Sequence, residues 1–179
     1  MEGHKRYESG QMQQKNLVAR RSELREGQNP SAVVVSCSDS RVVPEYIFDM
    51  GLGDVFTVIS AGNVVDKIGL GSIEYAVGHL HTPLIVVMGH EKCGAVSAAY
   101  HGHAESNITA IVKKITPAVK KARKGGAEAE EIEKACVNNV KAVIRKIKKS
   151  PVVKEKIEKG EVKVVGLKYY LDGRVEQVA

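Results

Sequence analysis

The sequence lacks tryptophan and has only two phenylalanines and six tyrosines, so it offers few aromatic surfaces on which nucleic-acid bases could stack. The formal net charge of +6 nevertheless raises the question of an anionic partner. Most of the excess lysine lies between residues 113 and 163, where it is interleaved with glutamate. Such mixed-sign patterning is typical of solvent-exposed helix faces. We therefore expect no nucleic-acid partner.

Long apolar segments are also missing. No stretch approaches the ~20 apolar residues of a transmembrane helix, and the segment from Met1 to Arg6 lacks the apolar core of a signal peptide. We expect no membrane partner and a cytoplasmic location. The three cysteines cannot all pair with one another, and in a reducing compartment metal binding is a commoner use of thiols than a disulfide framework.

Two motifs carry the chemistry: Cys37-Ser38-Asp39-Ser40-Arg41 and His90-Glu91-Lys92-Cys93. Each follows an apolar run that is typical of a buried β-strand, at 32–36 and 84–88. Loops at the carboxyl ends of parallel strands form the ligand-binding crevice of an open α/β sheet. Two thiols and one imidazole in that crevice would make a three-ligand zinc site and leave the fourth tetrahedral position for water. This donor set indicates a catalytic rather than a structural zinc.

The cysteines have a simpler interpretation as well. Taken singly, each fits a small buried apolar residue, and His-x-x-Cys alone is a weak signal. The joint placement of Cys37 and Cys93 after two apolar strands favours the metal interpretation. Cys136 lies in the middle of a predicted helix, between Ala135 and Val137, without a ligand-type neighbour. We interpret Cys136 as a packing residue.

Asp39 and Arg41 closely follow Cys37. A bidentate ion pair with Arg41 would keep Asp39 ionised and away from the metal. Asp39 would then fix the hydrogen of a zinc-bound hydroxide and direct an oxygen lone pair at an incoming electrophile. The alternative is an ordinary Asp-Arg surface turn. Because two thiolates cancel the charge of zinc, its water would ionise at mildly alkaline pH, and the site suits a small, neutral electrophile.

The chain is long enough for one domain, in which predicted strands alternate with predicted helices. This order predicts the α/β class, with a mainly parallel central β-sheet of about four to five strands flanked by helices. Residues 1–30 are expected to form an N-terminal helical arm, and residues 31–179 the zinc-binding α/β core. Further strands are expected at 55–59, 162–167 and 174–178. Helices are expected at 44–50, 69–81, 95–100, 107–124 and 127–149, with a short one from Pro151.

At these motifs the chain resembles the β-class carbonic anhydrases of the plant-like and bacterial type. The resemblance covers nearly the whole chain and also includes the segments 1–7, 27–30, 53–56, 61–63, 71–77 and 164–175. It implies the reversible hydration of carbon dioxide to bicarbonate and a proton, by attack of a zinc-bound hydroxide on CO2. The same zinc motifs occur in related hydrolases of carbon disulfide or carbonyl sulfide, which are the alternative. A non-catalytic zinc-binding homologue is another.

The resemblance also implies roles for individual residues. One Zn2+ per chain would be held by Cys37, His90 and Cys93, with an Asp39–Arg41 dyad orienting the hydroxide. In a closed state Asp39 would become the fourth ligand. The substrate-binding positions of the family are matched by Gln28, Phe56, Tyr75 and Gly94. The implied assembly is a homodimer or a dimer of dimers, in which the glutamine comes from the neighbouring subunit and the N-terminal arm reaches across the partner.

Two positions depart from the family pattern. Ile59 stands where an arginine usually helps to hold bicarbonate in the subgroup with an allosteric pocket, so we expect no such regulation here. His4 stands where asparagine is common. The remaining histidines outside the motifs could shuttle protons because imidazole titrates near neutrality. Exposed loop and helix-end positions are the simpler interpretation of these four: His79, His81, His101 and His103.

Overall fold

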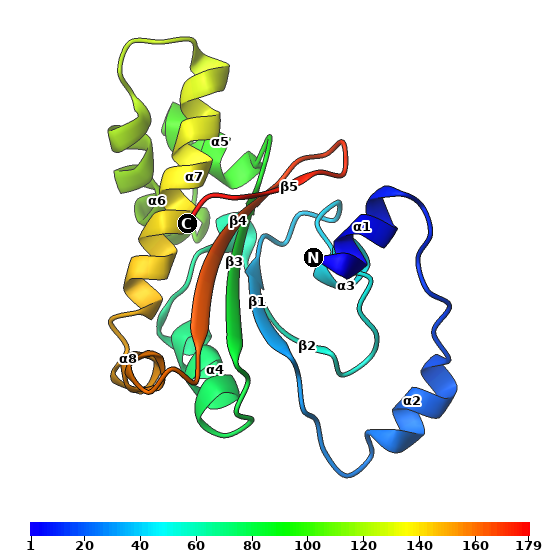
Figure 1. Ribbon diagram of the computed structural model, residues 1–179. Coiled ribbons are helices and arrows are strands. Elements are labelled where there is room, and N and C mark those ends of the chain that lie inside the picture. Colours follow the sequence, from blue (N-terminus) through cyan, green and yellow to red (C-terminus); the bar gives the residue numbers. More distant parts are fainter.

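The computed structural model describes all of residues 1–179 and is organised around a five-stranded sheet with the strand order β2-β1-β3-β4-β5 (Figure 1). The strands are β1 (Ala32–Ser36), β2 (Val55–Ile59), β3 (Leu84–His90), β4 (Lys163–Tyr169) and β5 (Val175–Gln177). β1 to β4 run parallel, and β5 pairs antiparallel with β4. The mainly parallel α/β sheet expected from the sequence is confirmed.

The central strand β1 is buried along its whole length because its side chains are apolar on both faces. Such continuous runs are typical of parallel sheets that are covered on both sides. Val33 and Val35 belong to one hydrophobic cluster, and Ala32 and Val34 to another, as the two-residue period of a strand requires. β1 and β3 are direct neighbours, with Val35 opposite Val87. Their carboxyl ends therefore lie side by side.

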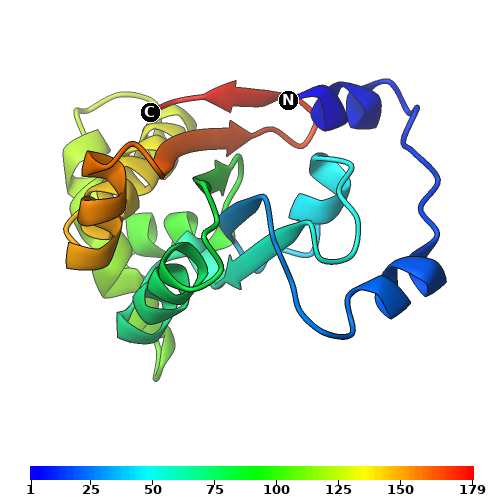
Figure 2. The ribbon, with the colours of Figure 1, turned by 60° about the horizontal axis from the view of Figure 1, so that its bottom comes forward.

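Helices pack on both faces of the sheet. The helices of the chain are α1 (Glu2–Glu8), α2 (Leu17–Glu23), α3 (Pro44–Ile47), α4 (Lys67–Gly78), α5 (Gly94–His101), α6 (Ile108–Ala122), α7 (Glu128–Ile147) and α8 (Pro151–Glu158). α4, α7 and α8 pack on the face of Val33 and Val35, whereas α3, with Tyr7 of α1, packs on the face of Val34. Figure 2 shows the sheet between these layers. None of the helices combines the length and the apolarity that a membrane span would need.

The structure differs from the sequence-based expectation at the ends of two strands. β3 continues through His90, and β4 continues through Tyr169. The two residues are paired across the sheet, and the next backbone N–H, that of Glu91, donates to the Tyr169 carbonyl at 2.9 Å. His90 is therefore the last residue of a central strand rather than part of a loop, and the ladder fixes its backbone.

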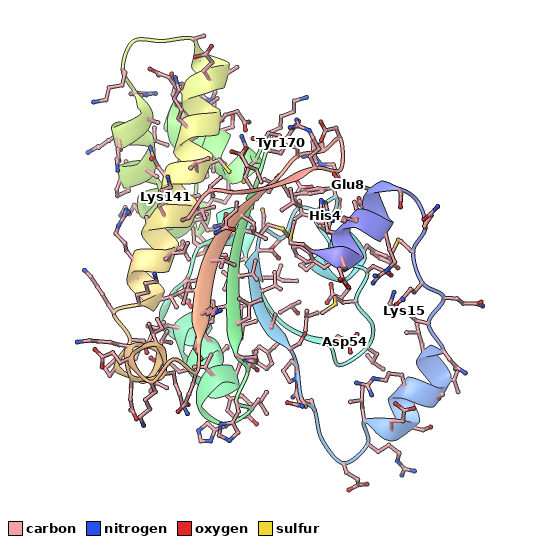
Figure 3. The ribbon with its side chains drawn as sticks, viewed as in Figure 1. His4, Glu8, Lys15, Asp54, Lys141 and Tyr170 are labelled. Atoms are coloured by element: carbon pink, nitrogen blue, oxygen red, sulfur yellow. The ribbon has the colours of Figure 1, made fainter.

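The N-terminal arm contains two short helices, α1 and α2. α1, which carries His4 (Figure 3), docks on its own chain. The Arg6 guanidinium donates to the Asp49 carboxylate at 2.5 Å, and His4 Nδ1 contacts the Ile47 carbonyl at 3.2 Å. Lys15, in the linker after α1, also pairs with Asp49. α2 has no buried residue and stands away from the sheet (Figure 1). The arm is thus tied to the core at α1 by buried contacts, whereas α2 is held through the exposed Arg20, whose Nε donates to the Leu52 carbonyl at 3.2 Å.

Candidate metal centre

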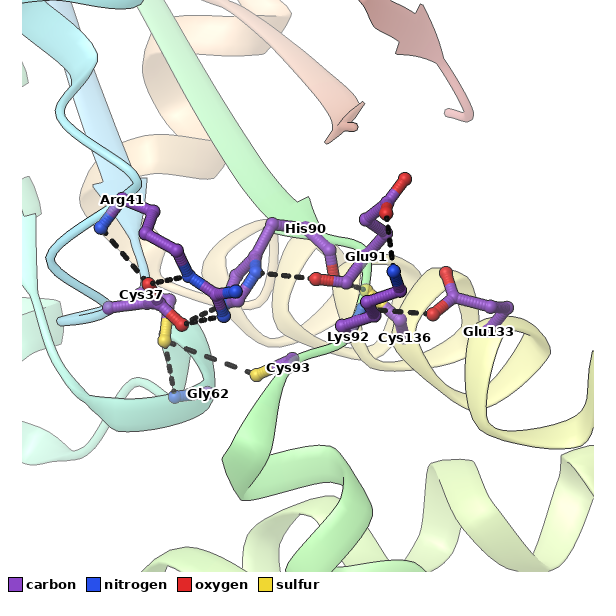
Figure 4. Close-up of polar contacts among 10 residues, drawn as sticks. Cys37, Arg41, Gly62, His90, Glu91, Lys92, Cys93, Glu133 and Cys136 are labelled. Atoms are coloured by element: carbon purple, nitrogen blue, oxygen red, sulfur yellow. Dashed lines mark hydrogen bonds and ion pairs between the residues drawn. The ribbon is translucent and has the colours of Figure 1, made fainter. Parts of the chain in front are cut away.

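Three potential metal ligands converge where β1 and β3 end. Cys37 directly follows β1, His90 is the last residue of β3, and Cys93 is the N-cap of α5. One ligand atom from each lies within 4.8 Å of the other two, and the two Sγ atoms are 4.0 Å apart (Figure 4). All three residues are buried. Adjacent strands thus bring together ligands that the sequence keeps far apart, and the cluster can hold one metal ion.

The imidazole of His90 is oriented for metal binding. Its Nδ1 lies 2.8 Å from the Glu91 carbonyl, and a carbonyl can only accept, so the proton belongs on Nδ1. Nε2 is buried and has no hydrogen-bond partner in the protein. A buried polar atom without a partner is costly, whereas metal-binding histidines commonly donate their other ring N–H to a carbonyl. The lone pair on Nε2 therefore fits a metal between the two sulfur atoms.

The sulfur atoms of the two cysteines lie within hydrogen-bonding distance of each other. This contact, opposed by burial, lowers the pKa of Cys37 to about 4. The same contact and burial raise the pKa of Cys93. The backbone N–H of Gly62 also donates to Cys37 Sγ at 3.2 Å, which favours the thiolate. Zinc coordinates thiolates and neutral imidazole, so this donor set fits Zn2+.

Asp39 and Arg41 form a bidentate ion pair beside the cluster. Arg41 Nε donates to Asp39 Oδ1 at 2.9 Å, and Arg41 Nη2 donates to Oδ2 at 2.7 Å. The backbone N–H of Arg41 donates to Oδ1 at 3.0 Å. The guanidinium, more than any other group, holds the pKa of Asp39 well below its usual range. Asp39 Oδ2 is 3.9 Å from His90 Nε2, so the carboxylate faces the metal position while Arg41 holds it.

The other expected pocket residues do not all lie near this cluster. Gly94 does, because it opens α5 immediately after Cys93. Phe56 pairs with Val33, three residues before the end of β2, and its ring centroid is 6.4 Å from that of Tyr75. Gln28 and Tyr75 line one surface cavity of about 800 Å³. Cys37 does not line this cavity, so within one chain Gln28, Phe56 and Tyr75 form a separate group.

Cys136 is buried and outside the ligand group, which confirms the packing interpretation. Its thiol donates to the His90 carbonyl at 3.1 Å, so it contacts the backbone of a ligand without offering its sulfur to the metal (Figure 4). The four remaining histidines near α4 and α5 are exposed, as the simpler interpretation expected.

Sequence reasoning missed the role of Gly62. In the sequence, the segment Ala61–Asn63 was noted only as part of the resemblance, but it forms a single 3-10 turn that directs the Gly62 N–H at Cys37 Sγ. Gly62 has φ +68°, and a Cβ there would lie 2.6 Å from Ile115 Cδ1. A glycine inside the Ala-Gly-Asn turn was the available signal, because a positive φ favours glycine.

Comparison with known proteins agrees with this geometry. The sequence model of the family described as carbonic anhydrase matches residues 32–175. A carbonic anhydrase of Mycolicibacterium smegmatis is 41% identical over 183 residues, covering 98% of this chain and 88% of that protein. Carbonic anhydrase 2 of Mycobacterium tuberculosis is 40% identical over 178 residues, covering 96% and 85%.

Solved structures agree as well. The β-carbonic anhydrase CafA of Aspergillus fumigatus superposes with a TM-score of 0.85 at 27% identity, over 90% of this chain and 82% of that one. A Coccomyxa β-carbonic anhydrase in complex with acetazolamide gives 0.80 at 30% identity, over 87% and 75%. The sequence, the fold and the Cys-His-Cys cluster together show that this chain belongs to the β-carbonic anhydrases, zinc enzymes that hydrate carbon dioxide reversibly to bicarbonate and a proton.

Proposed function

We propose that this chain hydrates carbon dioxide at the Cys37–His90–Cys93 cluster, with Asp39 and Arg41 as the residues that orient the reacting water. One observation carries the assignment. The buried, unpartnered Nε2 of His90 and two sulfur atoms converge beside a carboxylate that an arginine holds in place. A purely structural metal site would have no use for that held carboxylate.

Zinc held by these three residues would supply the charge that lowers the pKa of a bound water toward neutrality. Asp39 supplies the orientation. An ionised carboxylate only accepts hydrogen bonds, so Asp39 would accept a hydrogen from the water and leave an oxygen lone pair directed at CO2. The new C–O bond makes bicarbonate, and one proton leaves to the solvent.

Arg41 acts on the reaction through Asp39. Its two hydrogen bonds occupy both carboxylate oxygens, keep the group ionised and hold it beside the ligands rather than among them. Gly94, in the first turn of α5, would line the substrate position next to Cys93. Because its Cβ position has no atom within 4 Å, a side chain there would project into open space.

We further propose that the working species is a homodimer or a dimer of dimers. Gln28, Phe56 and Tyr75 gather away from the cysteines of their own chain, and α2 has no buried residue. A second copy would cover α2 and bring these side chains to the cluster of its neighbour. Solved relatives from Sordaria macrospora, 28% identical with a TM-score of 0.81 over 88% of this chain and 84% of theirs, are described as tetrameric.

Free, buried thiols fit a reducing compartment, and we place the enzyme in the cytoplasm.

The test combines metal analysis with a stopped-flow CO2 hydration assay on the same sample. We expect about one zinc per chain and a hydration rate well above that of buffer. A fully zinc-loaded protein that hydrates CO2 no faster than buffer would contradict the assignment.

A further inference from the structure

Helix α7 presents a polar face to the metal centre. Glu133, Cys136 and Asn139 are spaced three residues apart along α7, which places them on one side of the helix. Each side chain makes one hydrogen bond with the backbone near the ligands: Glu133 with Lys92, Cys136 with His90 and Asn139 with Gly62. Figure 4 shows Glu133 and Cys136 reaching from α7 toward the loop that follows β3. None of the three side chains belongs to the ligand cluster itself.

Glu133 holds the loop between His90 and Cys93. The backbone N–H of Lys92 donates to Glu133 Oε1 at 2.9 Å. Lys92 has φ +52°, a left-handed conformation that a lysine adopts at a cost. The other carboxylate oxygen of Glu133 pairs with Lys168 Nζ at 2.6 Å, and the Lys168 side chain is only 7% exposed. Lys168 therefore holds Glu133 in place, and Glu133 in turn stabilises Lys92, the strained residue between the ligands His90 and Cys93.

Asn139 acts on the third ligand through Gly62. Its side-chain Nδ2 donates to the Gly62 carbonyl at 2.8 Å, and Asn139 is buried. The N–H of the same Gly62 donates to Cys37 Sγ at 3.2 Å. Asn139 thus orients a backbone donor that stabilises the thiolate form of Cys37. Between these two contacts, the Cys136 thiol donates to the His90 carbonyl at 3.1 Å.

We propose that this polar face of α7 positions the metal ligands, with Glu133 and Asn139 as its principal residues. The proposal deepens the zinc site proposed above and rests on it. The hydrogen bonds of the Glu133 carboxylate and the Asn139 amide are directional, so they fix the backbone of the two loops beside the ligands. Apolar packing, such as that of Val140, is not directional. Gly89 permits the close approach, because a Cβ there would lie 2.9 Å from Cys136 Sγ.

Outer-shell partners of metal ligands are commonly worth about 10- to 100-fold in metal affinity. We expect Glu133→Ala and Asn139→Leu each to weaken zinc binding by that order, measured on the folded, metal-free protein by competition with a chromophoric chelator. Cobalt(II) substitution supplies a second readout, because the thiolate-to-metal absorption should shift as the ligands lose their orientation. Glu133→Gln should bind zinc more tightly than Glu133→Ala, since its amide oxygen can still accept from Lys92.

Glu130→Ala is the matched control. It removes a glutamate one turn before Glu133 whose side chain is 68% exposed and whose only ion pair is with Lys134, and it should leave zinc affinity and the cobalt spectrum unchanged. Circular dichroism of each metal-free variant checks the fold. If Asn139→Leu does not fold, Glu133→Ala and Glu133→Gln decide, because Glu133 lies at the edge of the core with its side chain 31% exposed.

Unchanged zinc affinity in folded Glu133→Ala would overturn the proposal, as would equal weakening by Glu130→Ala. Loss of thermal stability with a wild-type cobalt spectrum would also overturn it, because that pattern marks a merely structural role. Failure of the wild-type protein to bind zinc at all is a different result, which would reject the proposed function instead.

Discussion

The Sγ atoms of Cys37 and Cys93 lie 4.0 Å apart, although 56 residues separate them in the sequence. This distance is about twice the ~2.05 Å of a disulfide bond, and both thiols are free. His90 Nε2 lies beside the two sulfur atoms, and the three atoms together are placed to bind one tetrahedral metal ion rather than to form a disulfide.

Replacing any one ligand should remove metal and activity together. We expect Cys37→Ser, His90→Ala and Cys93→Ser each to lose zinc and CO2 hydration, measured by metal analysis and stopped-flow assay. Cys136→Ser is the control, since its hydroxyl can still donate to the His90 carbonyl; it should keep both. If Cys136→Ser strips the zinc while one of the other three retains it, the ligand assignment is wrong.

The ligand positions followed from the sequence because Cys37 directly follows one apolar strand and the motif from His90 to Cys93 follows another. The apolar run 32–36 predicted a buried strand, and parallel strands place their carboxyl ends at one edge. The supporting contacts could not be predicted in this way. Glu133 and Asn139 look like ordinary polar positions of an amphipathic helix, and their partners are backbone groups distant in the chain.

The contacts that hold the arm could not be predicted for the same reason. They converge on Asp49, a buried carboxylate that pairs with Arg6 and Lys15 and accepts a hydrogen bond from the Gln13 N–H. Nothing in the local sequence around Asp49 indicates that partners more than 30 residues earlier will converge on it. Tertiary contacts of this kind become visible only when the topology is known.

The Asp49 contacts predict a pH-dependent contribution to stability. Lys15, Arg6 and the Gln13 N–H lower the pKa of Asp49 below its usual range. Because the folded-state pKa is lowered, the stabilisation is complete above the unfolded value of about 3.9 and is lost as pH falls through the folded value. Asp49→Asn should therefore melt at a lower temperature than wild type at neutral pH, and the difference should shrink in acid. Glu23→Gln, on the exposed α2, is the control. A difference in melting temperature that stays constant down to pH ~2 would contradict the predicted loss of the Asp49 contribution in acid.

The assembly proposed above predicts that the active enzyme sediments as a dimer or larger. α2 has no buried residue, and Leu17 and Val18 on it are 56% and 67% exposed, which a partner subunit would cover. Sedimentation velocity combined with the hydration assay on the same fractions provides the measurement. A monomer with full activity would remove the need for a neighbour's Gln28.

Bicarbonate should not act as an allosteric inhibitor of this enzyme at moderately alkaline pH. Ile59, at the end of β2, is 52% exposed and cannot donate the charged hydrogen bonds that an arginine offers to a carbonate group. Initial rates at increasing bicarbonate should fall no more steeply than product inhibition requires. A cooperative, pH-dependent loss of activity would count against the prediction.

In the proposed mechanism, catalysis depends on the Asp39–Arg41 ion pair. Removing the guanidinium in Arg41→Ala frees Asp39, whose Oδ2 is already 3.9 Å from His90 Nε2, to move toward the metal position and displace the water. Asp39→Asn should keep zinc and retain partial activity, because an amide competes weakly for the metal and orients water poorly.

The most direct test is the zinc content and the CO2 hydration rate of Arg41→Ala, measured on one preparation. We predict zinc near the wild-type level and a hydration rate lower by about 100-fold or more. A structural zinc site would not separate metal retention from activity in this way. Wild-type hydration by zinc-loaded Arg41→Ala would contradict the proposed role of the dyad and, with it, the mechanism.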